Sequence, residues 1–185
     1  AMDAGVFVTK TASGTVVEDN TIVDNLYGIY LHGAVDSVAR GNRISGIREG
    51  RMNDAGNGVS VWNAPGAIVV ENDISFGRDG IFIIASKRNM FSRNRFSHVR
   101  FAIHYMYTDD SEVSDNVSIG NSVGYAIMYS NRLKITGNVS DGDRDHGFLF
   151  NYANGSEIAR NTVMGRLQPV ARWTTAGRQG GSHGV

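Results

Sequence analysis

Short runs of β-branched and aromatic residues recur along the chain at a nearly constant spacing. Six of these runs begin with a small residue followed by apolar side chains: GIYL (28–31), GVSV (58–61), GIFI (80–83), AIHY (102–105), AIMY (126–129) and GFLF (147–150). Runs of this length and composition are typical of β-strands and are too short for helices. The hydrophobic pattern therefore predicts an all-β protein.

A repeated asparagine marks the same period. The positions are Asn20, Asn42, Asn72, Asn94, Asn116, Asn138 and Asn161, with steps of 22, 30, 22, 22, 22 and 23 residues. Short strands at a fixed pitch predict a solenoid, and we expect a right-handed parallel β-helix of about 22 residues per coil and roughly seven coils. Asn tolerates left-handed backbone geometry and stacks its amides between coils, so these residues are interpreted as structural.

Two irregularities define the domain organisation. The 30-residue coil carries eight extra residues near 47–54, which predicts a surface loop, because insertions in a repeat usually project from one face. Beyond residue 165 the repeat stops, and Pro169 cannot donate to a central ladder. We therefore expect a β-helix over 1–165, truncated at both ends, and an irregular or disordered tail over 166–185.

Side chains on a strand alternate between two faces, so each run has an inner and an outer set. Nine and eleven residues after the repeated Asn the side chains are mostly aliphatic, and we expect them inside, with Leu149 among them in the last coil. Ten and twelve residues after it, the expected outer face is unusually apolar. Its predicted interaction surface comprises Tyr30, His32, Trp62, Phe82, Phe148 and Phe150. A contiguous exposed apolar patch generally marks a docking or ligand surface.

Three residues on this outer face have the chemistry of a soft-metal site. Met106 and Met128 occupy equivalent positions one coil apart, so their Cα atoms should lie ~4.8 Å apart. His104 lies two residues before Met106 on the same face, ~6.5–7 Å away by strand rise. Thioether and imidazole ligands together favour copper(I) over harder cations. Packing of flexible Met side chains in an apolar interface explains the same pattern, and both alternatives stay open.

A carbohydrate-binding or polysaccharide-modifying enzyme, such as a lyase, epimerase or hydrolase, is the alternative function. Its local candidates are Asp143, Asp145 and His146. Asp79 and Asp145 fall at equivalent positions three coils apart, so ~14 Å separates them, whereas glycosidase carboxylates lie roughly 5–9.5 Å apart. The Asp-Gly sequences are also ordinary turn chemistry. The large separation of Asp79 and Asp145 and the turn role of the Asp-Gly sequences together favour a protein that is not an enzyme.

Charge and composition narrow the possible partners. Lys+Arg and Asp+Glu number 18 each, which argues against nucleic acid as a ligand, and the chain has no Cys. The chain has no run of about 18 or more apolar residues, so no membrane span is predicted. The N-terminal AMDAGVFVTK does not have the pattern of a signal peptide.

The most distinctive segments resemble the NosD family of copper-processing β-helix proteins. They are HYMYT (104–108), AIMYS (126–130) and HGFLFNYANGS (146–156), and the likeness covers about residues 14–165. The resemblance implies a carbohydrate-binding/sugar-hydrolase-type β-helix, in agreement with the repeat. Because full-length members have a secretion signal and more coils, the chain resembles a fragment.

The resemblance also implies a biological role. Proteins of this family are expected in the periplasm, on an ABC transporter made of an ATPase and a membrane permease. They are expected to receive copper(I) transiently from a copper chaperone and to help load the copper centre of nitrous oxide reductase, an enzyme of denitrification. The likeness makes copper handling the leading hypothesis, with His104, Met106 and Met128 as its candidate ligands.

Overall fold

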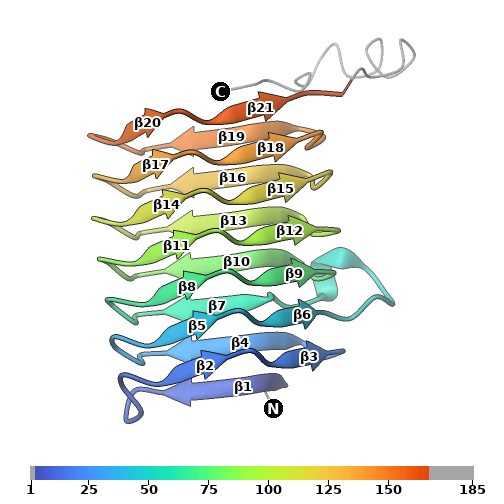
Figure 1. Cartoon of the computed structure of the whole chain (residues 1–185), viewed down its shortest axis with the longest axis vertical. Coiled ribbons are helices and arrows are strands. Elements are labelled where there is room, and N and C mark those ends of the chain that lie inside the picture. Colours follow the sequence, from blue (N-terminus) through green and yellow to red (C-terminus); the bar gives the residue numbers. More distant parts are fainter. Residues whose placement is uncertain (1–2, 167–185) are drawn as a thin grey trace.

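The chain winds into a parallel β-helix in the computed structural model, which describes residues 3–166 (Figure 1). Each coil contributes one strand to each of three seven-stranded parallel sheets, and the coils stack along one axis. The prediction of an all-β solenoid with roughly seven coils is confirmed. From residue 167 onward, the expected C-terminal tail lies outside the described residues.

The three sheets differ in strand length. Sheet A has the longest strands: β1 (Ala4–Thr9), β4 (Tyr27–His32), β7 (Val59–Trp62), β10 (Asp79–Ile84), β13 (Phe101–Met106), β16 (Val123–Met128) and β19 (His146–Asn151). Sheet B contains β2 (Val16–Glu18), β5 (Val38–Arg40), β8 (Ile68–Val70), β11 (Met90–Ser92), β14 (Glu112–Ser114), β17 (Lys134–Thr136) and β20 (Glu157–Ala159). Sheet C contains β3 (Thr21–Val23), β6 (Arg43–Ser45), β9 (Asp73–Ser75), β12 (Arg95–Ser97), β15 (Val117–Ile119), β18 (Val139–Asp141) and β21 (Thr162–Met164).

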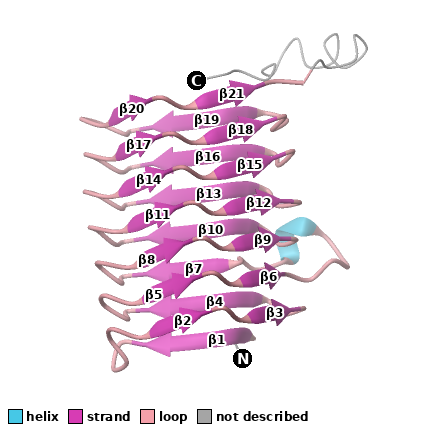
Figure 2. Cartoon of the chain, viewed as in Figure 1, coloured by secondary structure: helices cyan, strands magenta, loops and turns pink. Residues whose placement is uncertain are grey.

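The insertion predicted near 47–54 forms a loop between β6 and β7. It contains a single turn of 3-10 helix, η1 (Met52–Asp54), and projects beside the otherwise regular stack of coils (Figure 2). The strands on either side keep their pairing, with Ile29 opposite Val59 in sheet A. The extra residues therefore lengthen one turn without changing the register of the coils.

The repeated asparagines form a continuous ladder at the turn between sheets B and C. The backbone N–H and the Nδ2 of Asn72 both donate to Oδ1 of Asn94 at 3.0 Å, and Nδ2 also donates to the carbonyls of Ala39 and Val70. The same pattern links Asn94 to Asn116 on the next coil. Each amide thus binds donors and acceptors that the turn would otherwise leave unpaired.

The left-handed backbone at this turn belongs to the residue before each asparagine, not to the asparagine itself as we expected. These residues are Asp19, Gly41, Glu71, Arg93, Asp115, Gly137 and Arg160, with φ between 53° and 71°. Gly adopts this geometry at no steric cost, whereas the others carry strain that the surrounding coil must hold. The asparagine is required for its amide rather than for its backbone freedom.

Aliphatic and aromatic side chains fill the interior. Ile29, Val59, Ile81, Ile103 and Tyr125 pair in sequence along sheet A and are all fully buried, as the alternation predicted. Their stacking places apolar side chains over one another in successive coils, which forms one continuous core.

The last coil departs from the predicted alternation. Tyr125 pairs with Phe148 and Ile127 pairs with Phe150, so both Phe side chains pack in or against the core. The prediction that Phe148 and Phe150 lie on the outer surface was wrong, and Leu149 faces outward instead of inward. The cause is one extra residue between Asp143, which is still 22 residues from its neighbour Asn121, and β19, because a shift of one residue exchanges the two faces of a strand.

We predict that replacing an interior asparagine of the ladder destabilises the solenoid much more than replacing the terminal one. Asn94→Ala orphans the buried N–H of Asn72 and removes the donor to the carbonyl of Val69, so the free energy of unfolding should fall by about 2–4 kcal/mol. In Asn20→Ala, where the residue is exposed and the backbone N–H keeps its bond to Asn42, the loss should stay below about 1 kcal/mol. Urea unfolding followed by circular dichroism checks both values; equal losses would contradict the ladder's role.

Candidate functional site

The two methionines of the predicted copper site are direct neighbours on the outer face of sheet A. Met106 at the end of β13 pairs with Met128 at the end of β16, and both side chains are half-buried. Adjacent parallel strands lie about 4.8 Å apart, a separation that two flexible thioethers can bridge to reach one ion. The structure therefore brings together the pair that the repeat predicted.

His104 lies on the same face of β13, two residues before Met106, but it is less accessible than we expected. Only 8 % of the residue is exposed, because the ring contacts Phe82 and Phe101 at centroid distances of 5.1 and 5.0 Å. Its Nδ1 lies 3.0 Å from Oδ2 of Asp79, and its buried Nε2 has no hydrogen-bond partner among the described residues. One ring nitrogen is thus fixed and the other is unused.

Asp79 is the residue of this site that sequence reasoning missed. Its carboxylate is completely buried, and it accepts two hydrogen bonds from Arg100, from Nε at 2.9 Å and from Nη2 at 2.8 Å. Burial alone raises the pKa of Asp79, but the hydrogen bonds from His104 and Arg100 outweigh it and lower the pKa below its usual value. Asp79 is therefore an ionised group held inside an apolar surface.

The sequence does contain a signal for Asp79, which appears when the equivalent positions of successive coils are compared. On the next two coils the same position of sheet A holds Phe101 and Val123, so Asp79 is a charge at a position that is apolar on both of these coils. We placed it in the column of Asp145, but the extra residue of the last coil puts His146 there instead. The link to His104 crosses 25 residues and could not be found from spacing alone.

The described chain contains no clustered hard-ligand site. Among residues 3–166, no group of three or more His, Cys, Asp and Glu side chains is arranged to hold a metal ion. The candidate copper site is of another type, because two of its three side chains are thioethers, which bind soft ions.

Four of the six residues predicted for the interaction surface lie on the outer face of sheet A. His32 stacks on Trp62 with ring centroids 4.4 Å apart, and Tyr30 packs edge-on against His32 at 5.5 Å. Phe82 lies farther along the same face beside His104. Together Tyr30, His32, Trp62 and Phe82 leave an aromatic surface that extends toward the methionine pair.

A row of tyrosines borders the methionine pair and was not singled out in the sequence. Tyr107, Tyr129 and Tyr152 stack at 5.2 and 5.0 Å on successive coils, and 40–66 % of each residue is exposed. Two of them directly follow Met106 and Met128, so the repeated Met-Tyr pair was the available signal. Because the ring faces cover one another, the row presents mainly ring edges and hydroxyl groups to solvent.

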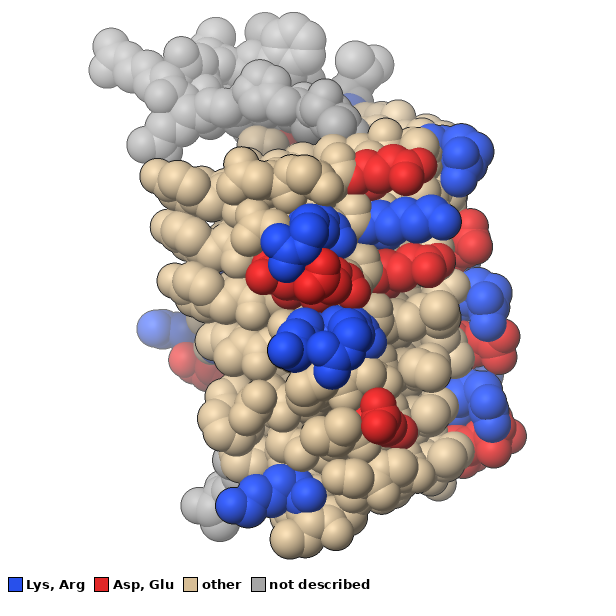
Figure 3. Space-filling view, turned by 90° about the vertical axis from the view of Figure 1, so that its left-hand side faces the viewer, with Lys and Arg blue, Asp and Glu red and all other residues tan. Residues whose placement is uncertain are grey.

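The side of the solenoid next to the outer face of sheet A carries charged side chains. Figure 3 shows Lys or Arg alternating with Asp or Glu along the axis where sheet A turns into sheet B. In sheet B, Glu112, Lys134 and Glu157 occupy one column on successive strands. Opposite charges on adjacent coils support the register, although exposed pairs of this kind contribute little each.

The alternative sugar-site residues do not share one surface. Asp143 is buried, and its carboxylate accepts hydrogen bonds from Ser118, Ser140 and the N–H of Asn121. Asp145 is exposed, and His146 begins β19 in a half-buried position. Burial raises the pKa of Asp143 despite these hydrogen bonds. The carboxylate of Asp143 therefore belongs to the interior of the coil.

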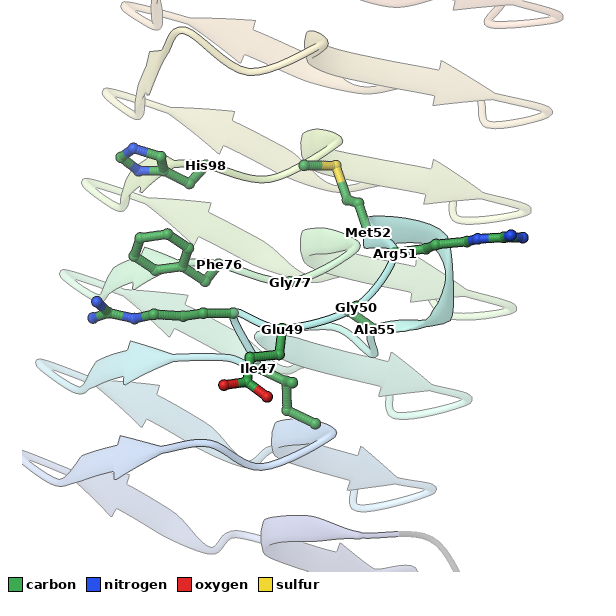
Figure 4. Close-up of a pocket in the computed structure, with 10 residues that line it drawn as sticks. Ile47, Glu49, Gly50, Arg51, Met52, Ala55, Phe76, Gly77 and His98 are labelled. Atoms are coloured by element: carbon green, nitrogen blue, oxygen red, sulfur yellow. The ribbon is translucent and has the colours of Figure 1, made fainter.

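The insertion loop encloses a small pocket of about 130 Å³ against two neighbouring turns (Figure 4). The ring of Phe76 lies between His98, stacked at 4.6 Å, and the guanidinium of Arg48 at 4.3 Å. Figure 4 shows Arg51 pointing away from Phe76 and His98. Ligand pockets usually measure roughly 300 Å³ or more, so this one is too small for an organic ligand of ordinary size.

The architecture of the chain is that of a parallel β-helix. A solved structure with a similar fold, DFA-IIIase from Arthrobacter chlorophenolicus A6 without its lid, superposes with a TM-score of 0.61 at 14 % identity. The match covers 90 % of this chain and 46 % of the other. At this level of identity the likeness extends to the fold alone. No helix among residues 3–166 is long and apolar enough to cross a membrane.

The chain belongs to the NosD family, whose model, described as "Periplasmic copper-binding protein (NosD)", matches residues 46–172. Two curated relatives carry the name "Probable ABC transporter binding protein NosD". The protein of Stutzerimonas stutzeri is 36 % identical over 88 % of this chain, and that of Pseudomonas aeruginosa is 38 % identical over 89 %. The resemblance found in the sequence is confirmed. The chain spans 37–38 % of the length of these relatives.

We predict that Asp143→Asn stabilises the protein at neutral pH. A buried carboxyl group whose folded-state pKa is raised loses stabilisation as pH rises from its ordinary value of 3.8 through the folded-state pKa. The amide keeps an acceptor for Ser118 and Asn121 and can donate to Ser140. Urea midpoints should therefore exceed those of the wild type at pH 7 and converge with them near pH 4. Asp145→Asn, in an exposed position, is the matched control; a variant less stable than wild type at pH 7 would contradict the prediction.

Proposed function

We propose that this chain is part of a periplasmic accessory protein that handles copper(I) for assembly of the nitrous oxide reductase copper centre. It would act with the permease and ATPase of an ABC transporter, take copper from a chaperone and pass it toward the reductase. The description of the family as periplasmic and copper-binding supports the compartment and the metal. The name of the relatives, which are ABC transporter binding proteins, supports the transporter.

The pairing of Met106 with Met128 is the observation that carries this proposal. Two thioethers on adjacent coils form a soft, partly exposed pair that suits copper(I) better than Mg²⁺, Ca²⁺ or Zn²⁺. Copper is the cargo here, not a resident cofactor. An incomplete ligand set suits transfer, because a closed site with four ligands would release the ion slowly.

His104 supplies the third candidate ligand through Nε2, which is buried and has no partner among residues 3–166. Because Nε2 is buried, copper can reach it only when a neighbouring side chain moves, and Phe82 and Phe101 are the aromatic rings in contact with the imidazole. The site would then hold copper between one imidazole and two thioethers. A ligand atom that is buried until copper arrives suits brief binding of copper rather than its storage.

The aromatic surface of Tyr30, His32, Trp62 and Phe82 is proposed to contact the proteins that donate or accept copper. These side chains continue along sheet A to the methionine pair, so a protein docked on them would lie over the metal ligands. Tyr and Trp are enriched in protein interfaces, because they bury a large apolar area with few rotatable bonds. No catalytic residue is assigned, and the proposed activity is binding and transfer.

Competition for copper(I) tests the proposal directly. The wild-type protein is titrated anaerobically with copper(I) bound to a chromogenic chelator, beside the double variant Met106→Ala/Met128→Ala. We expect the wild type to withdraw copper and the double variant to bind more than about tenfold more weakly, because loss of ligands should cost at least as much as loss of their supporting partners.

Met90→Ala is the matched control for this titration. Met90 lies on β11 of sheet B, on another face of the solenoid, and is exposed like a surface ligand. Its replacement should leave copper affinity at the wild-type level. A wild-type protein that withdraws no copper, or a double variant that competes as well as wild type, would remove the methionine pair as the copper site.

A further inference from the structure

The unsatisfied Nε2 of His104 calls for a physical explanation. Buried polar atoms in folded proteins nearly always have a hydrogen-bond partner, and an orphaned one costs roughly 1–3 kcal/mol. The ring is held on one side by Asp79 and flanked by Phe82 and Phe101, so it is fixed in a position that leaves Nε2 without a partner in the described part of the chain. A cost of this kind persists where the group is needed for something else.

The contact with Asp79 decides which ring nitrogen carries the proton. Both oxygens of the Asp79 carboxylate accept hydrogen bonds from the guanidinium of Arg100, which is always charged, so the carboxylate acts as an acceptor and Nδ1 donates to Oδ2. In the neutral imidazole the other nitrogen, Nε2, then keeps its lone pair, and a metal binds histidine through that lone pair. A carboxylate on the far nitrogen is also the usual support of a metal-binding histidine, which it orients and makes more basic.

We propose that Asp79 is the positioning residue of the copper site, holding His104 in the Nδ1–H tautomer with Nε2 free to bind copper(I). This inference rests on the proposed function and names a residue that completes it. Asp79 would not touch the metal. It acts through His104, and its own charge is offset by Arg100.

Arg100 explains why Asp79 stays available to His104. The guanidinium binds both carboxylate oxygens from one side, and Oδ2 also receives the imidazole. Its side chain is 30 % exposed and lies over the ring of Phe101 at 4.3 Å, so its charge is partly solvated. The guanidinium binds the carboxylate without engaging the histidine, so Oδ2 stays available to Nδ1 of His104.

The tautomer is measured first, in the metal-free wild-type protein. Two-dimensional NMR of ¹⁵N-labelled imidazole side chains distinguishes a protonated ring nitrogen from one with a lone pair. We expect His104 to show Nδ1–H and a free Nε2 at pH values where the ring is neutral. A spectrum with Nε2–H would overturn the inference without any variant and without copper.

Two substitutions then test the positioning role. In Asp79→Asn, Arg100 donates to the amide oxygen, so the NH₂ group faces Nδ1 of His104 and the ring shifts to Nε2–H. Copper(I) affinity should fall about 10- to 100-fold, the usual effect of losing a supporting partner. Glu71→Gln is the matched control, because it also removes a carboxylate paired with an arginine, here Arg93 at the turn between sheets B and C, so the tautomer of His104 and the copper(I) affinity should match the wild type.

The outcomes are distinguishable. Weak binding and a changed tautomer in Asp79→Asn, with both unchanged in Glu71→Gln, support the inference. Wild-type affinity in Asp79→Asn, or equal losses in the two variants, would show that Asp79 does not position the copper ligand and would leave the methionine site standing. Failure of the wild type to bind copper(I) would overturn the proposed function, and the ligand role of His104 with it.

Discussion

Hydrogen bonding between successive coils is the constraint on which the whole molecule depends. Each strand pairs in parallel with the strand one coil later, and the asparagine ladder repeats the same link at a turn. The amide of Asn94 serves two coils at once, so each coil fixes the position of the next. Because the side-chain period of a strand is two, this register also decides which residues face outward.

Constant register converts a sequence repeat into columns of like side chains. The core column is apolar, the exposed tyrosines stack ring on ring, and charges alternate along sheet B. The pair of Met106 and Met128 is one product of the same rule, because two residues far apart in the sequence become neighbours across a parallel ladder. A solenoid can in this way build a metal site from side chains that no local motif joins.

The outer face of sheet A contains a buried cluster of charged and polar side chains. Asp79 and His104 bury a charge and an imidazole among Phe side chains, with Arg100 compensating the charge. Replacing a buried ion pair by well-packed apolar side chains is often neutral or stabilising, so packing alone does not require such a cluster. Its position beside the methionine pair makes it the part of the surface most suited to a specific task.

The sequence by itself determined the repeat, the all-β class, the number of coils, the position of the insertion and the neighbouring positions of Met106 and Met128. These features follow from the intervals between residues of the same type, and those intervals can be read directly from the sequence. The tertiary structure alone decided the inward position of Phe148, because one extra residue exchanges the faces of a strand and the residue count does not say where the turn absorbs it. It alone also decided the partnership of Asp79 with His104, since side chains on different coils meet only after the coils are stacked.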